Sequence, residues 1–203
     1  MSESPLVILL LCGGGIYVAK MWWEDYQAHQ RGETIMGALP GATPTSRPAV
    51  IIAIMGTLIL LAAETLGEIK LGIDQEQSEI TVLFGLYTLV AAFIEEVIFR
   101  GYLVINDRSK FARRAAVLAA SVLFAAVHPF LWEWDDGVWT WTFTAKGWFS
   151  TGAIFLGSLW FYFVRFMPTN PQHSLLPCFA AHATKNLGVF LIKGVQGFVT
   201  GLW

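Results

Sequence analysis

The chain has 203 residues, of which 55% are hydrophobic and 14% charged, and its mean hydropathy is +0.56. This composition lies outside the usual range for soluble globular domains and predicts an integral, multi-pass membrane protein in contact with the lipid bilayer. The formal net charge of −2 leaves no basic surface to hold a nucleic-acid backbone, so nucleic acid is excluded as a partner. Cys12 and Cys178 form no C-x-x-C pair and are expected to pack as small apolar side chains.

Six charge-poor stretches approach the roughly 20 residues that a helix needs to cross the hydrocarbon core. In chain order they cover residues 5–21, 48–66, 80–105, 114–131, 148–166 and 175–192. We interpret the first as an uncleaved span, because no Lys or Arg precedes it. All are too long and too continuously apolar for the strands of a membrane barrel. The sequence predicts an all-α polytopic transmembrane helical bundle of about six spans, with one membrane domain over residues 1–203 and a motif-bearing core at about 80–190.

Positive charge is distributed unevenly between the two sides of this path. One side carries eight Lys and Arg residues, namely Lys20, Arg31, Arg47, Arg108, Lys110, Arg113, Arg114 and Arg165, and the other carries Lys70, Lys146 and Lys193. Because short cytoplasmic loops are enriched in Lys and Arg, we expect both termini outside and loop 106–113 in the cytoplasm. The expected location is the bacterial inner (cytoplasmic) membrane or a related internal membrane.

Between the fourth and fifth spans, residues 132–148 contain five tryptophans among three acidic residues. Amphipathic indoles at this density are typical of the headgroup layer. We interpret the segment as an aromatic belt that fixes helix depth, in preference to a specific lipid or substrate gate.

The third span contains two acids and a base in apolar surroundings, and charged residues in a membrane helix are candidates for a functional site. Glu96 and Arg100 are four residues apart, so they share a helical face and can form an ion pair that fixes helix packing. Glu95 lies about 100° around the helix and needs another partner, which suggests a site.

Two later spans provide further polar residues. Phe124 and His128 share one face of the fourth span, and His182 and Asn186 share one face of the sixth. At about 1.5 Å per residue, Glu95 and His128 lie at similar depths, and His182 and Asn186 are compatible with the same layer. Each pair alone could be interhelical packing, but together they predict a buried pocket.

The order and spacing of Glu95-Glu96-x-x-x-Arg100, Phe124-x-x-x-His128 and His182-x-x-x-Asn186 resemble the motifs of the CPBP family of intramembrane peptidases. This family includes CAAX-processing enzymes of the Ras-converting type and bacterial proteins linked to bacteriocin processing and immunity. The resemblance covers about residues 80–190, and it implies an intramembrane endopeptidase acting on a membrane-associated peptide or lipidated protein.

The resemblance also implies a role for each residue. Glu95 would act as general base on a water that His128 also holds, with Glu96 and Arg100 supporting it. His182 and Asn186 would form the oxyanion hole. This mechanism requires no cofactor. In the alternative, Glu95, His128 and His182 would be the ligands of Zn²⁺.

Two functions outside catalysis remain as alternatives. The chain could be a non-catalytic scaffold or accessory subunit with a membrane protein partner, because a fold does not guarantee activity. It could also be a transporter in which the carboxylates and histidines form a proton or ion relay. No inverted repeat is evident in the sequence, which argues against the transporter.

Overall fold

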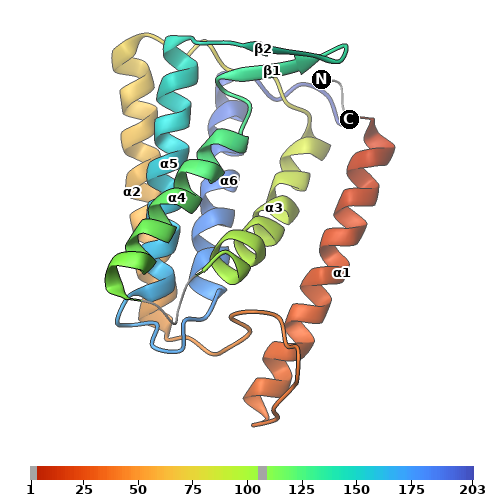
Figure 1. The fold of residues 1–203 in the computed structure, drawn as a ribbon. Coiled ribbons are helices and arrows are strands. Elements are labelled where there is room, and N and C mark those ends of the chain that lie inside the picture. Colours follow the sequence, from red (N-terminus) through yellow and green to blue (C-terminus); the bar gives the residue numbers. More distant parts are fainter. Residues whose placement is uncertain (1–3, 105–108) are drawn as a thin grey trace.

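The computed structural model describes residues 4–104 and 109–203, and six α-helices within them form a bundle (Figure 1). They are α1 (Pro5–Gln30), α2 (Arg47–Leu71), α3 (Val82–Glu96), α4 (Lys110–Val127), α5 (Ala145–Phe166) and α6 (Leu176–Gln196). A short π-helix, η1 (Val97–Tyr102), continues α3. The predicted all-α bundle is confirmed, and each helix covers most of one predicted span.

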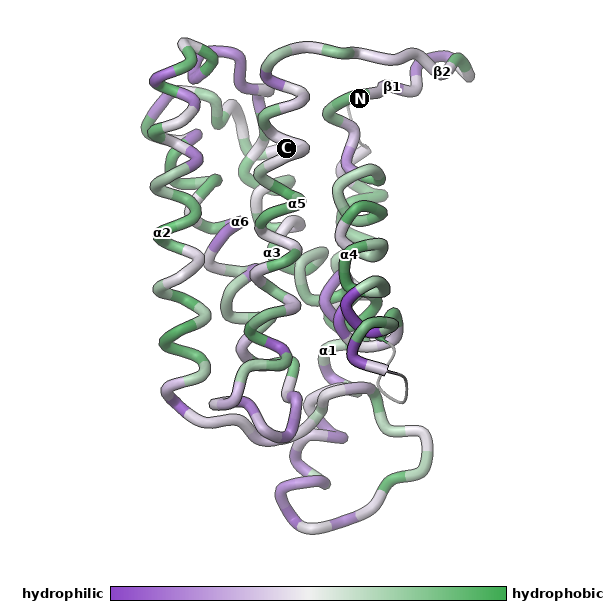
Figure 2. The backbone as a smooth tube through the Cα atoms, turned by 60° about the vertical axis from the view of Figure 1, so that its left-hand side comes forward, coloured by the Kyte–Doolittle hydropathy of each residue, from purple (hydrophilic) through white to green (hydrophobic). Residues whose placement is uncertain are grey.

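Four of the described helical segments are long and apolar enough to cross a membrane: α1, α2, the continuous α3–η1 and α5. Helix α4 starts with a basic turn, and α6 carries the polar residues His182, Lys185, Asn186 and Lys193, which lower the mean hydropathy of these two helices. Along the chain, hydrophilic residues gather at loops and helix ends, whereas the middle parts of the helices are mainly hydrophobic (Figure 2).

Local sequence sets where the helices begin and end. Four of them start after a Ser or Thr whose side chain accepts a hydrogen bond from a backbone N–H in the first turn, which satisfies an otherwise unpaired donor. These N-caps are Ser46, Thr81, Ser109 and Thr144. Helices α2 and α6 end at Gly72 and Gly197, whose φ values of 69° and 86° lie in the left-handed region that favours glycine.

Helix α6 lies inside the bundle and contacts α2, α3 and α5, while α4 packs against α5 and α1 packs against α3. Small residues allow these close approaches. At Gly188 a Cβ atom would lie 2.2 Å from Cδ2 of Leu61 in α2, and at Gly85 it would lie 2.3 Å from the ring of Phe190. α6 therefore carries its polar residues close to both α2 and α3.

The tryptophan-rich segment forms an antiparallel hairpin, β1 (Trp132–Asp135) and β2 (Val138–Trp141). Trp132 pairs with Trp141 and Trp134 with Trp139, so alternation places all four indoles on one face. The sequence reasoning placed no strand here. The missed signal is Asp136-Gly137, whose φ values of 46° and 78° suit a two-residue hairpin turn between alternating residues.

The hairpin, the start of α1 and the C-terminus lie at one end of the bundle, and the connections after α1 and α5 lie at the other (Figure 1). At that second end the two connections are joined, because Thr45 Oγ1 donates to Asn170 Oδ1 at 3.0 Å and Leu175 N donates to Gly41 O at 3.0 Å. Ile105, Asn106 and Arg108, which the predicted third span and cytoplasmic loop included, lie outside the described residues.

Candidate active site

The expected ion pair between Glu96 and Arg100 is present and fully buried. Arg100 Nη1 lies 3.1 Å from Glu96 Oε1, and both side chains have 0% exposure. Arg100 Nη2 also donates to Ser158 on α5, at 2.6 Å to Oγ and 3.3 Å to the carbonyl oxygen. The guanidinium stands 4.4 Å from the centroid of the Phe124 ring. The cation therefore has polar partners on two helices and an aromatic face from a third.

The π-helix η1 follows directly after the two glutamates, and side chains of α5 bind its backbone. Tyr162 donates its hydroxyl to the carbonyl of Phe99 at 2.6 Å, and Arg165 Nε donates to the carbonyl of Arg100 at 3.2 Å. A π-helix widens the turn and shifts the carbonyls that follow it, and such turns occur frequently at functional sites. Its partners on α5 keep this backbone satisfied inside the bundle.

Sequence reasoning missed Ser158 and Tyr162 and counted Arg165 only as a positive charge on the cytoplasmic side. All three place polar groups on one face of α5. Their signal was available: they recur at a spacing of four and three residues within an apolar span. Arg165 is also buried, and its Nη1 has no hydrogen-bond partner.

His182 lies between the two neighbouring glutamates. Its Nδ1 is 2.8 Å from Glu96 Oε1, and its Nε2 is 3.7 Å from Glu95 Oε2. Because Glu96 is ion-paired with Arg100, its carboxylate accepts the hydrogen bond, and Nδ1 of His182 carries the proton. The distance to Glu95 is longer than a hydrogen bond, so this contact leaves Nε2 uncommitted beside the second carboxylate.

The two glutamates differ in accessibility. The side chain of Glu95 is 32% exposed, whereas that of Glu96 has no exposure. Two buried atoms of the ion pair, Glu96 Oε2 and Arg100 Nε, have no hydrogen-bond partner. Unsatisfied buried polar atoms are rare and often mark a functional or water-binding position. The protein therefore leaves part of the Glu95 side chain uncovered and encloses that of its neighbour.

His128 is the C-cap of α4 and contacts Phe124, which also lies against Arg100 of the buried ion pair. Its Nδ1 is 2.7 Å from the carbonyl oxygen of Phe124, which can only accept, so Nδ1 carries a proton and Nε2 of the neutral ring is an acceptor. The ring of Phe124 lies 4.8 Å from the His128 ring and 6.0 Å from the His182 ring. The two histidines thus pack on the same phenyl ring.

Asn186 faces α3 further along its length. Its Nδ2 donates to the carbonyl of Thr88 at 2.8 Å, seven residues before Glu95 and therefore about 10 Å along the helix. The structure thus brings Glu95, Glu96, Arg100 and His182 into one network, links His128 to it through Phe124, and joins Asn186 to α3. The second N–H of the Asn186 amide remains available.

Whether these residues fit a metal can be tested on their arrangement. Among residues 4–104 and 109–203, no group of three or more His, Cys, Asp and Glu side chains is placed to hold a metal ion. In particular, His128 packs against Phe124 and Phe130. Glu95, His128 and His182 as arranged do not fit a three-ligand zinc centre.

A family model described as Type II CAAX prenyl endopeptidase Rce1-like matches residues 77–188, more than half of the 203-residue chain. The matched range includes all six candidate site residues. No curated protein and no solved structure matches the chain. The chain belongs to the Rce1-like family, which confirms the resemblance drawn from the three motifs and makes it, at the level of the family, a CAAX-type intramembrane protease.

Proposed function

We propose that this membrane protease hydrolyses a peptide bond near the end of a membrane-associated or lipidated substrate with a water molecule that Glu95 activates. The observation that carries the proposal is the position of the His182 ring, at 2.8 Å from the buried Glu96 and 3.7 Å from the accessible Glu95. A carboxylate that orients an imidazole beside a second, partly exposed carboxylate is an arrangement suited to general acid–base catalysis.

In the proposed reaction, Glu95 removes a proton from a water molecule as the water oxygen bonds to the carbonyl carbon of the substrate. Nε2 of His128, an acceptor in the neutral ring, receives a hydrogen bond from the same water. The carbonyl oxygen gains negative charge and accepts hydrogen bonds from the free N–H of Asn186 and from Nε2–H of His182. In this proposal the His182 ring is an imidazolium before the water attacks and keeps both of its protons throughout. The carbon–nitrogen bond then breaks, and Glu95 returns its proton to the leaving amine.

Three features of the site support these assignments. Glu96 and Arg100 neutralise each other, so they can hold His182 without adding net charge beside Glu95. The side chain of Glu95 is 32% exposed, so the protein does not enclose its carboxylate and leaves space beside it for a water molecule. The contact of Asn186 with Thr88 fixes the amide on the face of α6 that carries His182.

The proposal is tested by comparing the wild type with Glu95→Gln in nanodiscs, using a library of membrane peptides and mass spectrometry to detect products. The substitution keeps the shape of the side chain and removes the base. We expect cleavage by the wild type and loss of cleavage by the variant. Elemental analysis of the wild type is the second measurement, because stoichiometric zinc would favour the metal mechanism.

The outcome that contradicts the proposal is equally specific. If neither protein cleaves any peptide while both are folded, the scaffold or accessory-subunit alternative gains support. If Glu95→Gln cleaves as fast as the wild type, the base is a different residue.

A further inference from the structure

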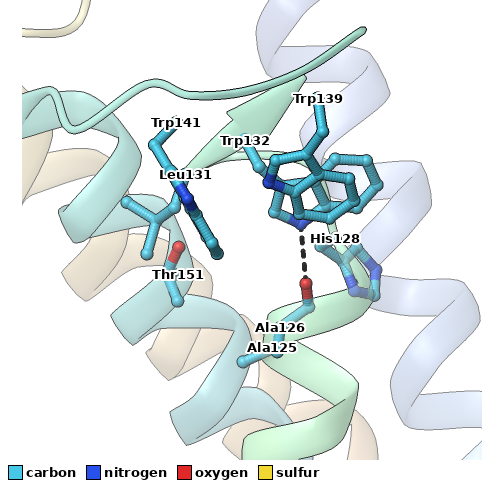
Figure 3. A pocket seen from close by; sticks show the side chains of 8 residues that line it. All are labelled: Ala125, Ala126, His128, Leu131, Trp132, Trp139, Trp141 and Thr151. Atoms are coloured by element: carbon cyan, nitrogen blue, oxygen red, sulfur yellow. Dashed lines mark hydrogen bonds between the residues drawn. The ribbon is translucent and has the colours of Figure 1, made fainter. Parts of the chain in front are cut away.

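A cavity of about 240 Å³ lies beside His128, where the tryptophan hairpin meets α4 and α5 (Figure 3). Its walls come mainly from the end of α4 and from the hairpin. These residues are Ala125, Ala126, His128, Trp132, Trp139 and Trp141. His128, which is proposed to take part in catalysis, therefore forms part of the wall. An aromatic belt that fixes helix depth would not explain this cavity.

The hairpin side of this cavity is fixed in place. Trp132 Nε1 donates to the carbonyl of Ala126 at 2.8 Å, and the rings of Trp132 and Trp139 stack with centroids 4.4 Å apart (Figure 3). The base of the hairpin is closed by Thr142 N, which donates to the carbonyl of Leu131 at 2.9 Å. The indole walls are thus preformed, which reduces the entropic cost of binding a ligand between them.

The chemistry of the lining selects an apolar ligand. None of its residues is acidic, and none is a lysine or arginine. Three polar groups of the lining already have partners: Trp132 Nε1, His128 Nδ1 and Thr151 Oγ1, which donates to the carbonyl of Gly147 at 2.8 Å. Alternation along β1 directs Glu133 and Asp135 to the opposite face of the hairpin.

The size of the cavity favours a single side chain. Its volume of about 240 Å³ exceeds the roughly 150 Å³ of a cavity that holds benzene and is below the range of about 300–1,000 Å³ typical of pockets for larger ligands. Trp139 and Trp141 are 44% and 62% exposed, so the hairpin wall can be reached from outside. One bulky aliphatic or aromatic group fits these limits better than a complete lipid chain.

We infer that this cavity is a specificity subsite that takes one bulky apolar side chain of the peptide substrate, next to the scissile bond. The inference rests on the proposed function, because it is the role of His128 that places the cavity beside the reacting water. Filling or emptying the subsite should change which peptides bind while leaving Glu95, His182 and the ion pair in place.

The test uses the full-length chain with Glu95→Gln in nanodiscs, so that bound peptide is not consumed. Each peptide of a set carries a diazirine analogue of leucine at one position, and photo-adducts are mapped by mass spectrometry. We expect adducts on the hairpin tryptophans from one or two adjacent peptide positions only. Adding Ala126→Phe, which fills the cavity, should lower this labelling by about tenfold or more.

Val122→Phe is the matched control, because Val122 lies one turn earlier on α4, is 54% exposed and does not line the cavity. Its hairpin tryptophans should be labelled to the same extent as those of the chain that carries Glu95→Gln alone. Equal labelling from every peptide position, or unchanged labelling after Ala126→Phe, would overturn the subsite. Labelling of the same tryptophans by a diazirine phospholipid that excess peptide does not displace would make the cavity a lipid site and also overturn it.

Cleavage of the same peptides by the chain with Glu95 intact separates this inference from the proposed function. Cleavage without position-specific labelling would refute the subsite and leave the peptidase. Position-specific labelling without cleavage would support the cavity as a peptide-binding site and refute the peptidase.

Discussion

Glu95 and Glu96 are adjacent in sequence and have different environments. Glu96 is enclosed with Arg100 and His182 at distances of 3.1 and 2.8 Å, whereas Glu95 is 32% exposed and has one loose contact, with His182. A buried charge depends on its partners, while an accessible one can be changed without leaving another charge unpaired. This difference separates the structural carboxylate from the one proposed to react.

Glu96→Gln should therefore destabilise the protein much more than Glu95→Gln. Removing the charge of Glu96 leaves Arg100 buried without its ionic partner, which costs about 3–5 kcal/mol. Glu95→Gln should change the free energy of unfolding by less than about 1 kcal/mol. Unfolding in mixed micelles with increasing SDS measures both values. Equal effects of the two substitutions would contradict the assignment.

His173, in the connection after α5, makes stability depend on pH. Burial, with the positive charges of Arg165 and Arg113, lowers the pKa of His173 below its ordinary value of 6.5. As the pH falls, His173 is protonated in the unfolded chain at a higher pH than in the folded protein. The free energy of unfolding is therefore unaffected by this group above about pH 6.5 and decreases as the pH falls from there through the pKa of the folded state.

His173→Asn should reduce the loss of stability between about pH 7 and pH 5. Asparagine tolerates the left-handed backbone of this position, where φ is 50°. Thermal unfolding at several pH values measures the slope, with His29→Asn at an exposed histidine of α1 as the control. The same slope in His173→Asn as in the wild type would show that another group titrates.

Two backbone carbonyls of η1 accept hydrogen bonds from side chains of α5. Tyr162→Phe removes the donor to Phe99 O and should cost about 0.5–1.5 kcal/mol of unfolding free energy. Faster amide hydrogen exchange in residues 97–102 should accompany this loss. Tyr102→Phe is the control, since it removes a hydroxyl from a side chain of η1 that is 62% exposed. Similar exchange rates in both variants would show that the hydrogen bond from Tyr162 does not stabilise η1.

The start of α5 leaves no room for a side chain at Gly147. A Cβ atom there would lie 2.3 Å from the carbonyl oxygen of Phe130, next to the base of the hairpin. Gly147→Ala should lower the free energy of unfolding by about 1–3 kcal/mol through overpacking. It should also make tryptophan fluorescence easier to quench with a soluble quencher, because the hairpin shifts.

Gly152→Ala in the same helix meets no atom within 4 Å and should stabilise α5 by about 0.5–1 kcal/mol. Unfolding in mixed micelles compares the two variants. A neutral Gly147→Ala would show that the hairpin base adapts without strain.

For the whole molecule, the sequence was sufficient to predict the helices and the family. Long apolar runs separated by charged residues define the helices, because backbone N–H and C=O groups in lipid must form hydrogen bonds with each other. The third predicted span, for example, covered α3 and η1 together, from residue 80 to beyond Tyr102. The ion pair of Glu96 and Arg100 followed from their spacing within one helix.

Contacts between helices were harder to predict, because depth along a helix does not define its rotation. The sequence placed His182 in the same layer as Glu95, yet its main contact is with Glu96. The π-helix and the support from Tyr162 and Arg165 depend on how α5 packs, which no local pattern specifies. The hairpin was missed for another reason, since the tryptophans were assigned to the headgroup layer and the Asp136-Gly137 turn signal was not used.

We propose that Glu95 is the base and that the network of Glu96, Arg100 and His182 positions the site. The most direct test is the single-turnover rate constant for one cleaved peptide, measured in nanodiscs for the wild type and for Glu95→Gln at equal folded concentration. We expect a decrease of about 10²–10⁴-fold in Glu95→Gln, the usual contribution of a general base. A folded Glu95→Gln protein that cleaves within about threefold of the wild-type rate would contradict it, because a base of this kind contributes far more.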